Sequence, residues 1–192
     1  MPSAARASAI RAMLPNIEPE YREACEGILF GKPRSFSQGW QDWWMAHNIF
    51  SQRLTFGDGF YVEMGVWNPT FVSNTLFFDK CLGWRGVCFE PNPQWHALIR
   101  RNRSCTLVPH CAFDRNVSVA LVKHGQSGGD AFVQPTKAKA HSSRCVVAAD
   151  ALRSLGHANT RIDLLSIDIE GSEPEVIRSC CCPSRFNMCP HA

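Results

Sequence analysis

The stretch that decides the fold is Phe60-Tyr-Val-Glu-Met-Gly65, a short apolar run that ends at a glycine. A second apolar run, Gly86-Val-Cys-Phe-Glu90, follows it along the chain and ends at an acidic residue. In a parallel α/β sheet, a glycine after the first strand lets the backbone approach a ligand closely, and a carboxylate after the second strand accepts both hydroxyls of a ribose. The two runs together predict a site for a nucleotide-type cofactor at the carboxyl ends of adjacent strands.

The composition is that of a globular domain without a strong charge bias. Of the 192 residues, 45% are hydrophobic and 19% are charged, which suits one domain with a sizeable core. The 20 basic and 17 acidic residues leave a formal net charge of +3, too small an excess for an electrostatic footprint on nucleic acid. No apolar run approaches the roughly 18 residues that a membrane span needs. We expect a soluble, cytoplasmic protein with neither a nucleic-acid partner nor a membrane span; the oligomeric state stays open.

The first residues, 1–16, carry Arg6 and Arg11 among alanines and serines and contain no acid. This composition is typical of an organellar transit peptide and equally of a disordered tail. Organellar targeting is therefore an alternative to a cytoplasmic location.

The ten cysteines do not form a recognisable framework. Four of them fall in apolar runs predicted as buried strands, where free cysteine is an ordinary small apolar filler: Cys88, Cys105, Cys111 and Cys145. A domain of this length does not need disulfides. The C-terminal group Cys180-Cys-Cys182, Cys189 and His191 lacks the C-x2-C spacing that orients two thiolates on one zinc ion. We expect free thiols in the core and no metal site.

Hydrophobic periodicity predicts alternating strands and helices. Strands are expected at residues 60–64, 87–89, 105–111 and 162–167, and helices at residues 18–29, 37–54, 70–82, 93–101, 150–156 and 174–178. This order calls for a parallel sheet with right-handed crossovers. Residues 117–122 and 131–133 flank a glycine-rich turn at 125–130 and predict a hairpin beside the sheet.

The predicted helix at 37–54 carries a bulky stripe that consists of Trp40, Trp43, Trp44, His47, Ile49 and Phe50. Large aromatic side chains usually serve burial. We expect this stripe to face the core rather than to form a ligand platform.

Several motifs, in this order and at this spacing, resemble the FkbM family of methyltransferases. They are Ser37-Gln-Gly-Trp-Gln-Asp42, Asn48-Ile-Phe50, Phe60-Tyr-Val-Glu-Met-Gly65, Ser73-Asn-Thr75, Leu82-Gly-Trp84, Phe89-Glu-Pro-Asn-Pro93 and Ile162-Asp-Leu-Leu-Ser-Ile-Asp-Ile-Glu-Gly171. The resemblance covers most of residues 37–177. It implies an α/β, Rossmann-like class I fold, a parallel sheet with flanking helices, that binds S-adenosylmethionine and moves its methyl group to a hydroxyl oxygen of a small molecule or glycan.

The resemblance also implies roles for particular residues. The implied cofactor-binding residues are Glu63 and Gly65 on the methionine side, Asn68 in the loop that follows, Glu90 at the ribose diol, and Ala112 and Asp114 near the adenine. Asp168 and Glu170 border the place where the sulfonium meets the acceptor. Because the methyl group is already activated, the enzyme must align oxygen, carbon and sulfur and exclude water. Asp168 is the expected base for an alcohol acceptor, with Glu170 second for the same role or as the residue that orients the acceptor; no catalytic metal is required.

Plainer interpretations of these acids remain open. Glu63 also fits a cap for the helix near residue 70, and Glu90 fits an ordinary turn acid. Asp168 and Glu170 also fit caps for the helix that follows them.

The chain departs from the family pattern in two ways. Pro69 stands where the family commonly has a further glycine, so an amide donor is missing there. The chain also ends after the fourth core strand, from which we expect a truncated domain. The expected organisation is a tail and short helix over 1–36, an incomplete methyltransferase domain over 37–178 and a Cys/Pro-rich irregular tail over 179–192.

Two other functions compete with methyl transfer. A catalytically inactive relative would retain the fold as a binding or interaction module, with turnover abolished by Pro69 and the short C-terminus. A nicotinamide-dependent oxidoreductase would also use a ribose-binding acid, but it requires the fuller G-x-G-x-x-G run that residues 65–69 lack.

Overall fold

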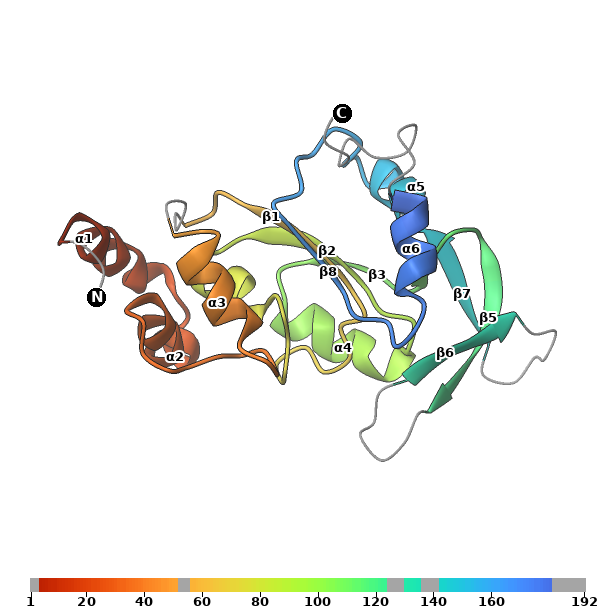
Figure 1. The fold of residues 1–192 in the computed structure, drawn as a ribbon, viewed down its shortest axis with the longest axis horizontal. Coiled ribbons are helices and arrows are strands. Elements are labelled where there is room, and N and C mark those ends of the chain that lie inside the picture. Colours follow the sequence, from red (N-terminus) through yellow and green to blue (C-terminus); the bar gives the residue numbers. More distant parts are fainter. Residues whose placement is uncertain (1–3, 52–55, 124–129, 136–141, 181–192) are drawn as a thin grey trace.

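The computed structural model describes residues 4–51, 56–123, 130–135 and 142–180. Its centre is a parallel sheet of β1 (Phe60–Met64), β2 (Arg85–Phe89), β3 (Thr106–Val108) and β8 (Leu164–Ile167). These four strands lie in the order β3-β2-β1-β8, with helices on both sides (Figure 1). The predicted Rossmann-like α/β class with a parallel sheet and flanking helices is confirmed.

Both faces of β1 are covered, because alternate side chains of a strand point to opposite faces. Tyr61 belongs to the apolar cluster formed with the N-terminal helices, whereas Val62 and Met64 belong to the cluster on the other face. Val62 lies opposite Val87 of β2 in the parallel register. Because both faces of β1 are buried, the strand is an almost continuous apolar run and does not alternate between apolar and polar residues.

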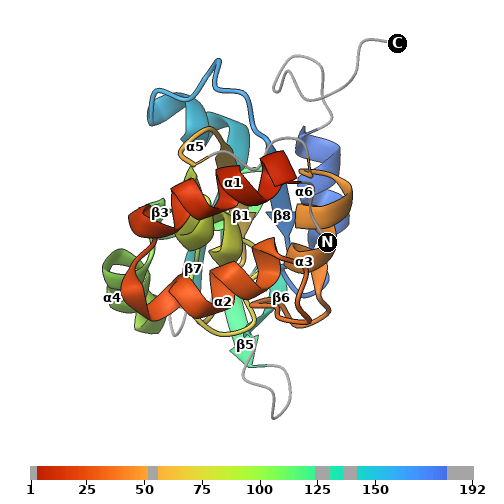
Figure 2. The same cartoon turned by 90° about the vertical axis from the view of Figure 1, so that its left-hand side faces the viewer.

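The N-terminal helices α1 (Ala4–Met13), α2 (Pro19–Leu29) and α3 (Gln41–Asn48) lie together at one end of the molecule, with the single turn η1 (Leu14–Asn16) between α1 and α2 (Figure 1). In the view of Figure 2, α1 and α2 run in front of the central sheet. Ile10 and Met13 of α1 are buried in the core cluster. Residues 4–13 are therefore an ordered, packed helix and not a disordered tail.

Helix α3 is shorter than the predicted helix at 37–54, and the expectation that its aromatic stripe faces the core is wrong in part. Trp40 and Trp44 are 46% and 54% exposed, while Ala46 and Phe50 are buried. Within α3 itself, Trp43 and His47 lie four positions apart and are half-buried, whereas Trp44 points outward. Trp40 is the N-cap of α3, with a left-handed φ of +63°, and Ile49 and Phe50 follow its last residue, so the predicted stripe extends beyond the helix at both ends.

The predicted helix at 70–82 is also shorter, because it begins only after Ser73. The Ser73 hydroxyl oxygen accepts hydrogen bonds from the backbone N–H groups of Thr75 and Leu76 and so fixes the turn that leads into the helix. The helical segment that follows, η2 (Phe77–Cys81), is a π-helical turn. Glu63, for which helix capping was the plainer interpretation, does not cap it.

A second sheet lies at the end of the molecule opposite α1 to α3 (Figure 1). It comprises β4 (Cys111–Phe113), β5 (Val117–Lys123), β6 (Asp130–Pro135) and β7 (Ser142–Val147) in the order β4-β7-β5-β6. The antiparallel pairing of β5 with β6 confirms the predicted hairpin, although the turn at 124–129 lies outside the described residues. The single strand predicted at 105–111 is wrong: Pro109, which has no N–H to donate, separates β3 from β4, and these strands belong to different sheets.

Three further helices complete the layers. Helix α4 (Pro93–Asn102) begins as predicted, with Pro93 in its first turn and the Asn92 side chain accepting from the backbone N–H of Gln94. Helices α5 (Ala148–Ser154) and α6 (Glu173–Cys180) cover the other face of the central sheet. Leu152 and Val176 pack there against the β1 and β2 side chains.

The expectation of free thiols in the core is wrong. Among the described residues, disulfide bonds join Cys25 of α2 to Cys81 of η2, Cys88 of β2 to Cys105 before β3, and Cys111 of β4 to Cys145 of β7. These partners are 17 to 56 positions apart in the sequence, so their spacing gave no sign of the pairing. Cys181, Cys182, Cys189 and His191, which the zinc interpretation needs, lie outside the described residues. Within the described ranges, no helix has the length and apolar character to cross a membrane.

Candidate active site

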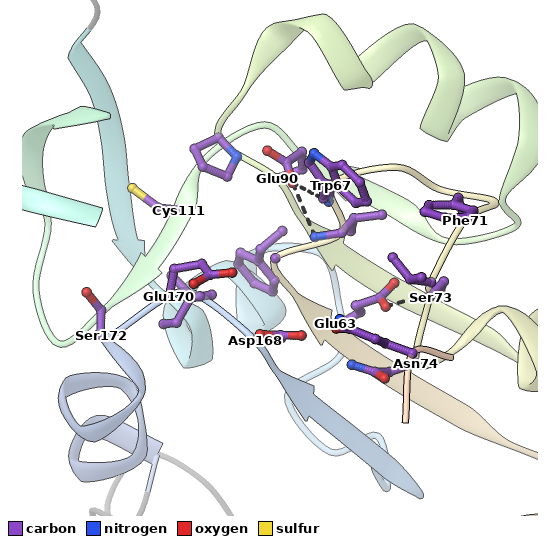
Figure 3. A pocket seen from close by; sticks show the side chains of 18 residues that line it. Glu63, Trp67, Phe71, Ser73, Asn74, Glu90, Cys111, Asp168, Glu170 and Ser172 are labelled. Carbon is purple, nitrogen blue, oxygen red and sulfur yellow. Dashed lines mark hydrogen bonds between the residues drawn. The ribbon is translucent and has the colours of Figure 1, made fainter. Parts of the chain in front are cut away.

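A cavity of about 450 Å³ opens at the carboxyl ends of β1, β2 and β8 (Figure 3). This is the place where ligands bind in open α/β sheets, since the chain leaves β1 toward one neighbour and later returns to its other side. Six of the eight residues expected from the resemblance line it: Glu63, Gly65, Glu90, Ala112, Asp168 and Glu170.

Asn68 and Asp114 do not line this cavity. The Asn68 side-chain oxygen accepts from the backbone N–H and the hydroxyl of Thr70. Its hydrogen bonds therefore stabilise the loop after β1. Asp114 follows β4 and pairs with Arg115, its neighbour in the chain.

Gly65 stands where two strand ends leave no room for a side chain. Its φ angle is +83°, and a Cβ atom built there would lie 1.9 Å from the carbonyl oxygen of Asp168. Its N–H donates to the Phe89 carbonyl at 3.0 Å, and the Asp168 N–H donates to the Met64 carbonyl at 3.0 Å. Only glycine permits this close approach of β1 to β8.

Glu90 is buried, and backbone donors fix the orientation of its carboxylate at the cavity wall. One carboxylate oxygen accepts from the N–H groups of Val66 at 3.2 Å and Trp67 at 2.8 Å. The other accepts from the Asn92 N–H at 2.8 Å. Glu90 therefore serves the turn after β2, as its plainer interpretation expected, and also joins the loop after β1 to that turn.

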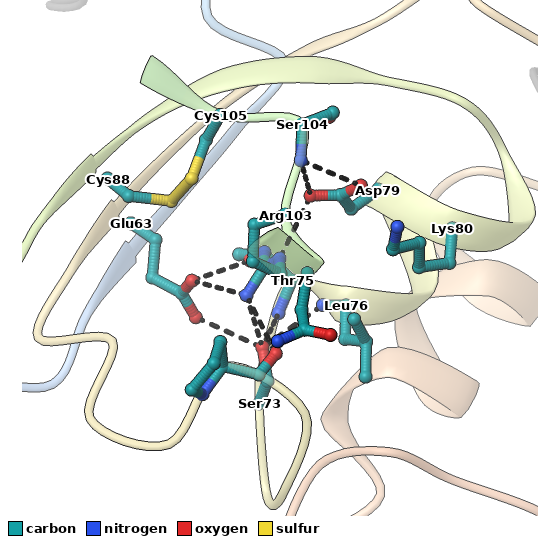
Figure 4. Close-up of polar contacts among 12 residues, drawn as sticks. Glu63, Ser73, Thr75, Leu76, Asp79, Lys80, Cys88, Arg103, Ser104 and Cys105 are labelled. Atoms are coloured by element: carbon teal, nitrogen blue, oxygen red, sulfur yellow. Dashed lines mark hydrogen bonds and ion pairs between the residues drawn. A yellow bond between two sulfur atoms is a disulfide. The ribbon is translucent and has the colours of Figure 1, made fainter. Parts of the chain in front are cut away.

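Glu63 belongs to a buried polar network centred on Arg103 (Figure 4). The Arg103 guanidinium donates to Glu63 at 3.2 Å and to Asp79 at 2.9 Å. It also donates to the hydroxyl groups of Tyr61 and Thr75, and Thr75 donates to Glu63 at 2.8 Å. One guanidinium thus holds two carboxylates, of which Glu63 faces the cavity.

The burial of this network changes its proton affinities. Burial raises the pKa of the Glu63 carboxyl above its ordinary value, although the Arg103 guanidinium acts in the opposite direction. Burial lowers the pKa of Arg103, but the neighbouring Glu63, Tyr61 and Asp79 outweigh that effect and raise it. Arg103 therefore stays charged, and a further cation beside Glu63 would favour the ionised carboxylate.

Backbone strain is concentrated at the cavity. Four described residues other than glycine have a positive φ, and three of them, Trp67, Val72 and Glu170, line the cavity. Such conformations cost of the order of 1–3 kcal/mol each and persist where the surrounding structure imposes them, which is common at ligand sites. The strain supports the assignment of this cavity as the functional site.

Asp168 and Glu170 do not cap α6, contrary to their plainer interpretation. Glu173, the first residue of α6, reaches back to the preceding loop, where its carboxylate accepts from the N–H groups of Ile169 and Gly171, each at 2.9 Å. The Asp168 and Glu170 side chains belong instead to the cavity lining (Figure 3).

The cavity is acidic. Four carboxylates line it, and none of the described lining residues is a lysine, an arginine or a histidine. Arg103 stands behind Glu63 and offsets part of this charge. The cavity therefore favours cationic ligands over anionic ones.

The cavity lining also has an aromatic part that was not predicted from the sequence. Trp67 and Phe71 come from the loop after β1, with ring centroids 6.2 Å apart, and Phe71 is 60% exposed at the cavity. Gln38 and Asn74 also line the cavity. Their motifs, Ser37-Gln-Gly and Ser73-Asn-Thr75, carried the family resemblance, and that was the available signal. Arg103 gave none, because it lies between a predicted helix and a predicted strand.

Comparison with known proteins gives one family. Residues 56–188 match the methyltransferase FkbM domain. No curated protein and no solved structure matches the chain. The matched range covers more than half of the chain and includes nearly the whole cavity lining, so this chain belongs to the FkbM methyltransferase family.

Proposed function

We propose that this protein is an S-adenosylmethionine-dependent methyltransferase that methylates a hydroxyl group of an uncharged small molecule or glycan. The observation that carries the proposal is the convergence of Gly65, Glu90 and Asp168 on one cavity at the carboxyl ends of β1, β2 and β8. Membership of the FkbM family supports methyl transfer as the reaction.

The residues present fit this cofactor. Gly65 lines the cavity, and its lack of a side chain keeps the ends of β1 and β8 in close contact beneath the proposed cofactor. Glu90, held by three backbone donors, is the proposed acceptor for the ribose hydroxyls. Ala112 is small and lies on the proposed adenine side. Glu63 is the proposed partner for the α-amino group of the methionine end, because among the described residues its network pairs two carboxylates with one guanidinium.

The acidic lining also bears on turnover. S-adenosylmethionine brings an activated methyl group on a positively charged sulfur, and that charge is lost when the methyl group leaves. Four lining carboxylates stabilise the cofactor more than the demethylated product, which lacks the sulfonium charge. The same charge disfavours acceptors that carry a phosphate or carboxylate.

Asp168 is the proposed base, because it follows β8 directly and lines the cavity together with Gly65. Its carboxylate accepts the proton of the acceptor hydroxyl as the new bond to oxygen forms. Glu170, held at a φ of +55° in the same loop, is proposed to orient the acceptor. Trp67 and Phe71 give the cavity an aromatic wall on the side of the loop after β1.

The reaction is tested by measuring the demethylated product formed from S-adenosylmethionine with a panel of uncharged polyols and sugars. The Asp168→Asn variant keeps the size of the side chain and removes the base. We expect it to lower kcat about 10²-fold to 10⁴-fold, with a smaller loss of cofactor affinity because one of the four lining carboxylates is neutralised. Equal rates in the two proteins would show that Asp168 is not the base. If none of the tested acceptors yielded the demethylated product, methylation of uncharged hydroxyl compounds would be contradicted.

The inactive binding module remains the second candidate, because Pro69 lacks an amide donor. The structure weakens this argument: Pro69 is not part of the cavity lining, and its carbonyl lies 3.4 Å from the Arg103 guanidinium, which donates to it. A module would bind no S-adenosylmethionine, so a cofactor titration distinguishes the two candidates.

A further inference from the structure

The three disulfides indicate an oxidising environment for the folded chain. Each one joins two different segments of the core, and Cys25, Cys81, Cys88 and Cys145 are fully buried. Disulfides persist in secretory compartments and outside cells and are rare in the reducing cytosol. This observation counts against the cytoplasmic location expected from composition.

An acceptor sequence for N-linked glycans stands on the surface of the same structure. Asn116-Val-Ser118 fits the N-x-S/T pattern, and both Asn116 and Ser118 are exposed. Asn116 lies in the connection between β4 and β5, outside any helix or strand. It is not part of the cavity lining.

We propose that the chain passes through an oxidising secretory compartment and that Asn116 there receives an N-linked glycan. The side-chain nitrogen of Asn116 forms a bond to the anomeric carbon of a lipid-pyrophosphate-linked oligosaccharide. The bond from that carbon to the pyrophosphate oxygen breaks, the lipid pyrophosphate leaves, and the displaced amide proton passes to a base of the glycosyltransferase. Each disulfide forms by loss of two electrons and two protons from a thiol pair to a disulfide-carrying oxidoreductase of the same compartment.

The chain contains a second sequon that serves as an internal control. In Asn102-Arg-Ser104, the Asn102 amide donates to the Leu98 carbonyl at 2.8 Å, and the Ser104 hydroxyl donates to the Trp84 carbonyl at 3.1 Å. Arg103 between them is buried in the polar network. A glycan on the Asn102 side-chain nitrogen would disrupt its hydrogen bond to the Leu98 carbonyl, so Asn116 is the preferred site.

The direct test uses the full chain isolated from the cells that produce it. Removal of N-glycans with an amidase in ¹⁸O-labelled water converts a glycosylated asparagine to labelled aspartate, which peptide mass spectrometry locates. We expect label at Asn116 and none at Asn102, with the six paired cysteines alkylated only after reduction. An unlabelled Asn116, equal label at both sites, or alkylation of these cysteines without reduction would overturn the proposal.

Variants directed to the secretory lumen of a eukaryotic host separate glycosylation from misfolding. Asn116→Gln and Ser118→Ala are expected to lose the mass of one glycan, whereas Ser118→Thr and Asn102→Gln are expected to keep it. Retention of the glycan in Asn116→Gln would contradict the assignment. The inference does not depend on methyl transfer, because Asn116 does not line the cavity.

Discussion

At Gly65 the backbone has room for hydrogen and for nothing larger. Gly65→Ala places a Cβ atom against the Asp168 carbonyl and strains a φ of +83°. We expect a loss of at least about 1–3 kcal/mol in the free energy of unfolding, and loss of S-adenosylmethionine binding because β1 and β8 are forced apart. Urea unfolding and calorimetry measure the two effects.

Gly156→Ala is the matched control for this substitution. Gly156 has a φ of +86°, and no atom lies within 4 Å of a Cβ built there. It carries the cost of the backbone conformation without the clash, so the difference between the two variants isolates the contact with Asp168. Equal destabilisation in both would contradict the close approach of the two strand ends.

At the scale of elements, Arg103 joins β1, the loop before η2 and η2 itself. Arg103→Met leaves Glu63 and Asp79 buried without their cation. We expect a loss of about 3–5 kcal/mol in the free energy of unfolding, because an uncompensated buried charge is costly. Urea unfolding at neutral pH measures it.

Arg34→Met is the control, since it removes an exposed ion pair between Arg34 and Glu23. Exposed pairs contribute about 1 kcal/mol or less. If the two arginine variants unfolded at the same urea concentration, the buried network would not stabilise the fold as described.

The elements that sequence analysis predicted well carry local signals. The strand β1 is an apolar run that ends at Gly65, and α4 begins where Asn92 and Pro93 provide a cap and a first-turn proline. The elements that it missed depend on distant partners. The late start of η2 follows from the Ser73 hydrogen bonds in the preceding turn and from the Arg103 network, and the separation of β3 from β4 follows from pairing with β7.

In the candidate site, too, residues with a local sequence signal were predicted, and residues placed by distant contacts were not. Glu90 and Asp168 were predictable, because each follows an apolar run whose strand ends at the same edge of the sheet. Trp67 and Phe71 were not, because their loop has no periodicity and its shape follows from the backbone contacts of Glu90. The disulfide partners were hidden for a related reason: strand pairing, and not sequence spacing, makes Cys111 and Cys145 neighbours.

At the scale of the whole molecule, disulfide bonds are found at both ends of the fold. Cys25–Cys81 fixes the N-terminal helices, and Cys111–Cys145 fixes the second sheet. Closing loops of 17 to 56 residues stabilises a fold by about 3–4 kcal/mol per bond in the chain-entropy account.

We therefore expect reduction under denaturing conditions to lower the urea midpoint of the whole chain markedly. Comparing unfolding with and without reductant measures the effect, and alkylation after each step confirms the redox state. Coincident midpoints for the fully reduced and oxidised chains would contradict a stabilising role for these bonds.

The central claim is that S-adenosylmethionine binds in the cavity with its ribose at Glu90, and isothermal titration calorimetry tests it most directly. We predict saturable one-site binding of S-adenosylmethionine to the whole chain, and weaker binding of its demethylated product, which lacks the sulfonium charge. Glu90→Gln should weaken cofactor binding about 10-fold to 100-fold, since hydrogen bonds to a charged group contribute about 1.5–3 kcal/mol. Glu20→Gln, at an exposed position of α2, should leave it unchanged. Absence of saturable heat, or equal affinity in the Glu90 and Glu20 variants, would contradict the account.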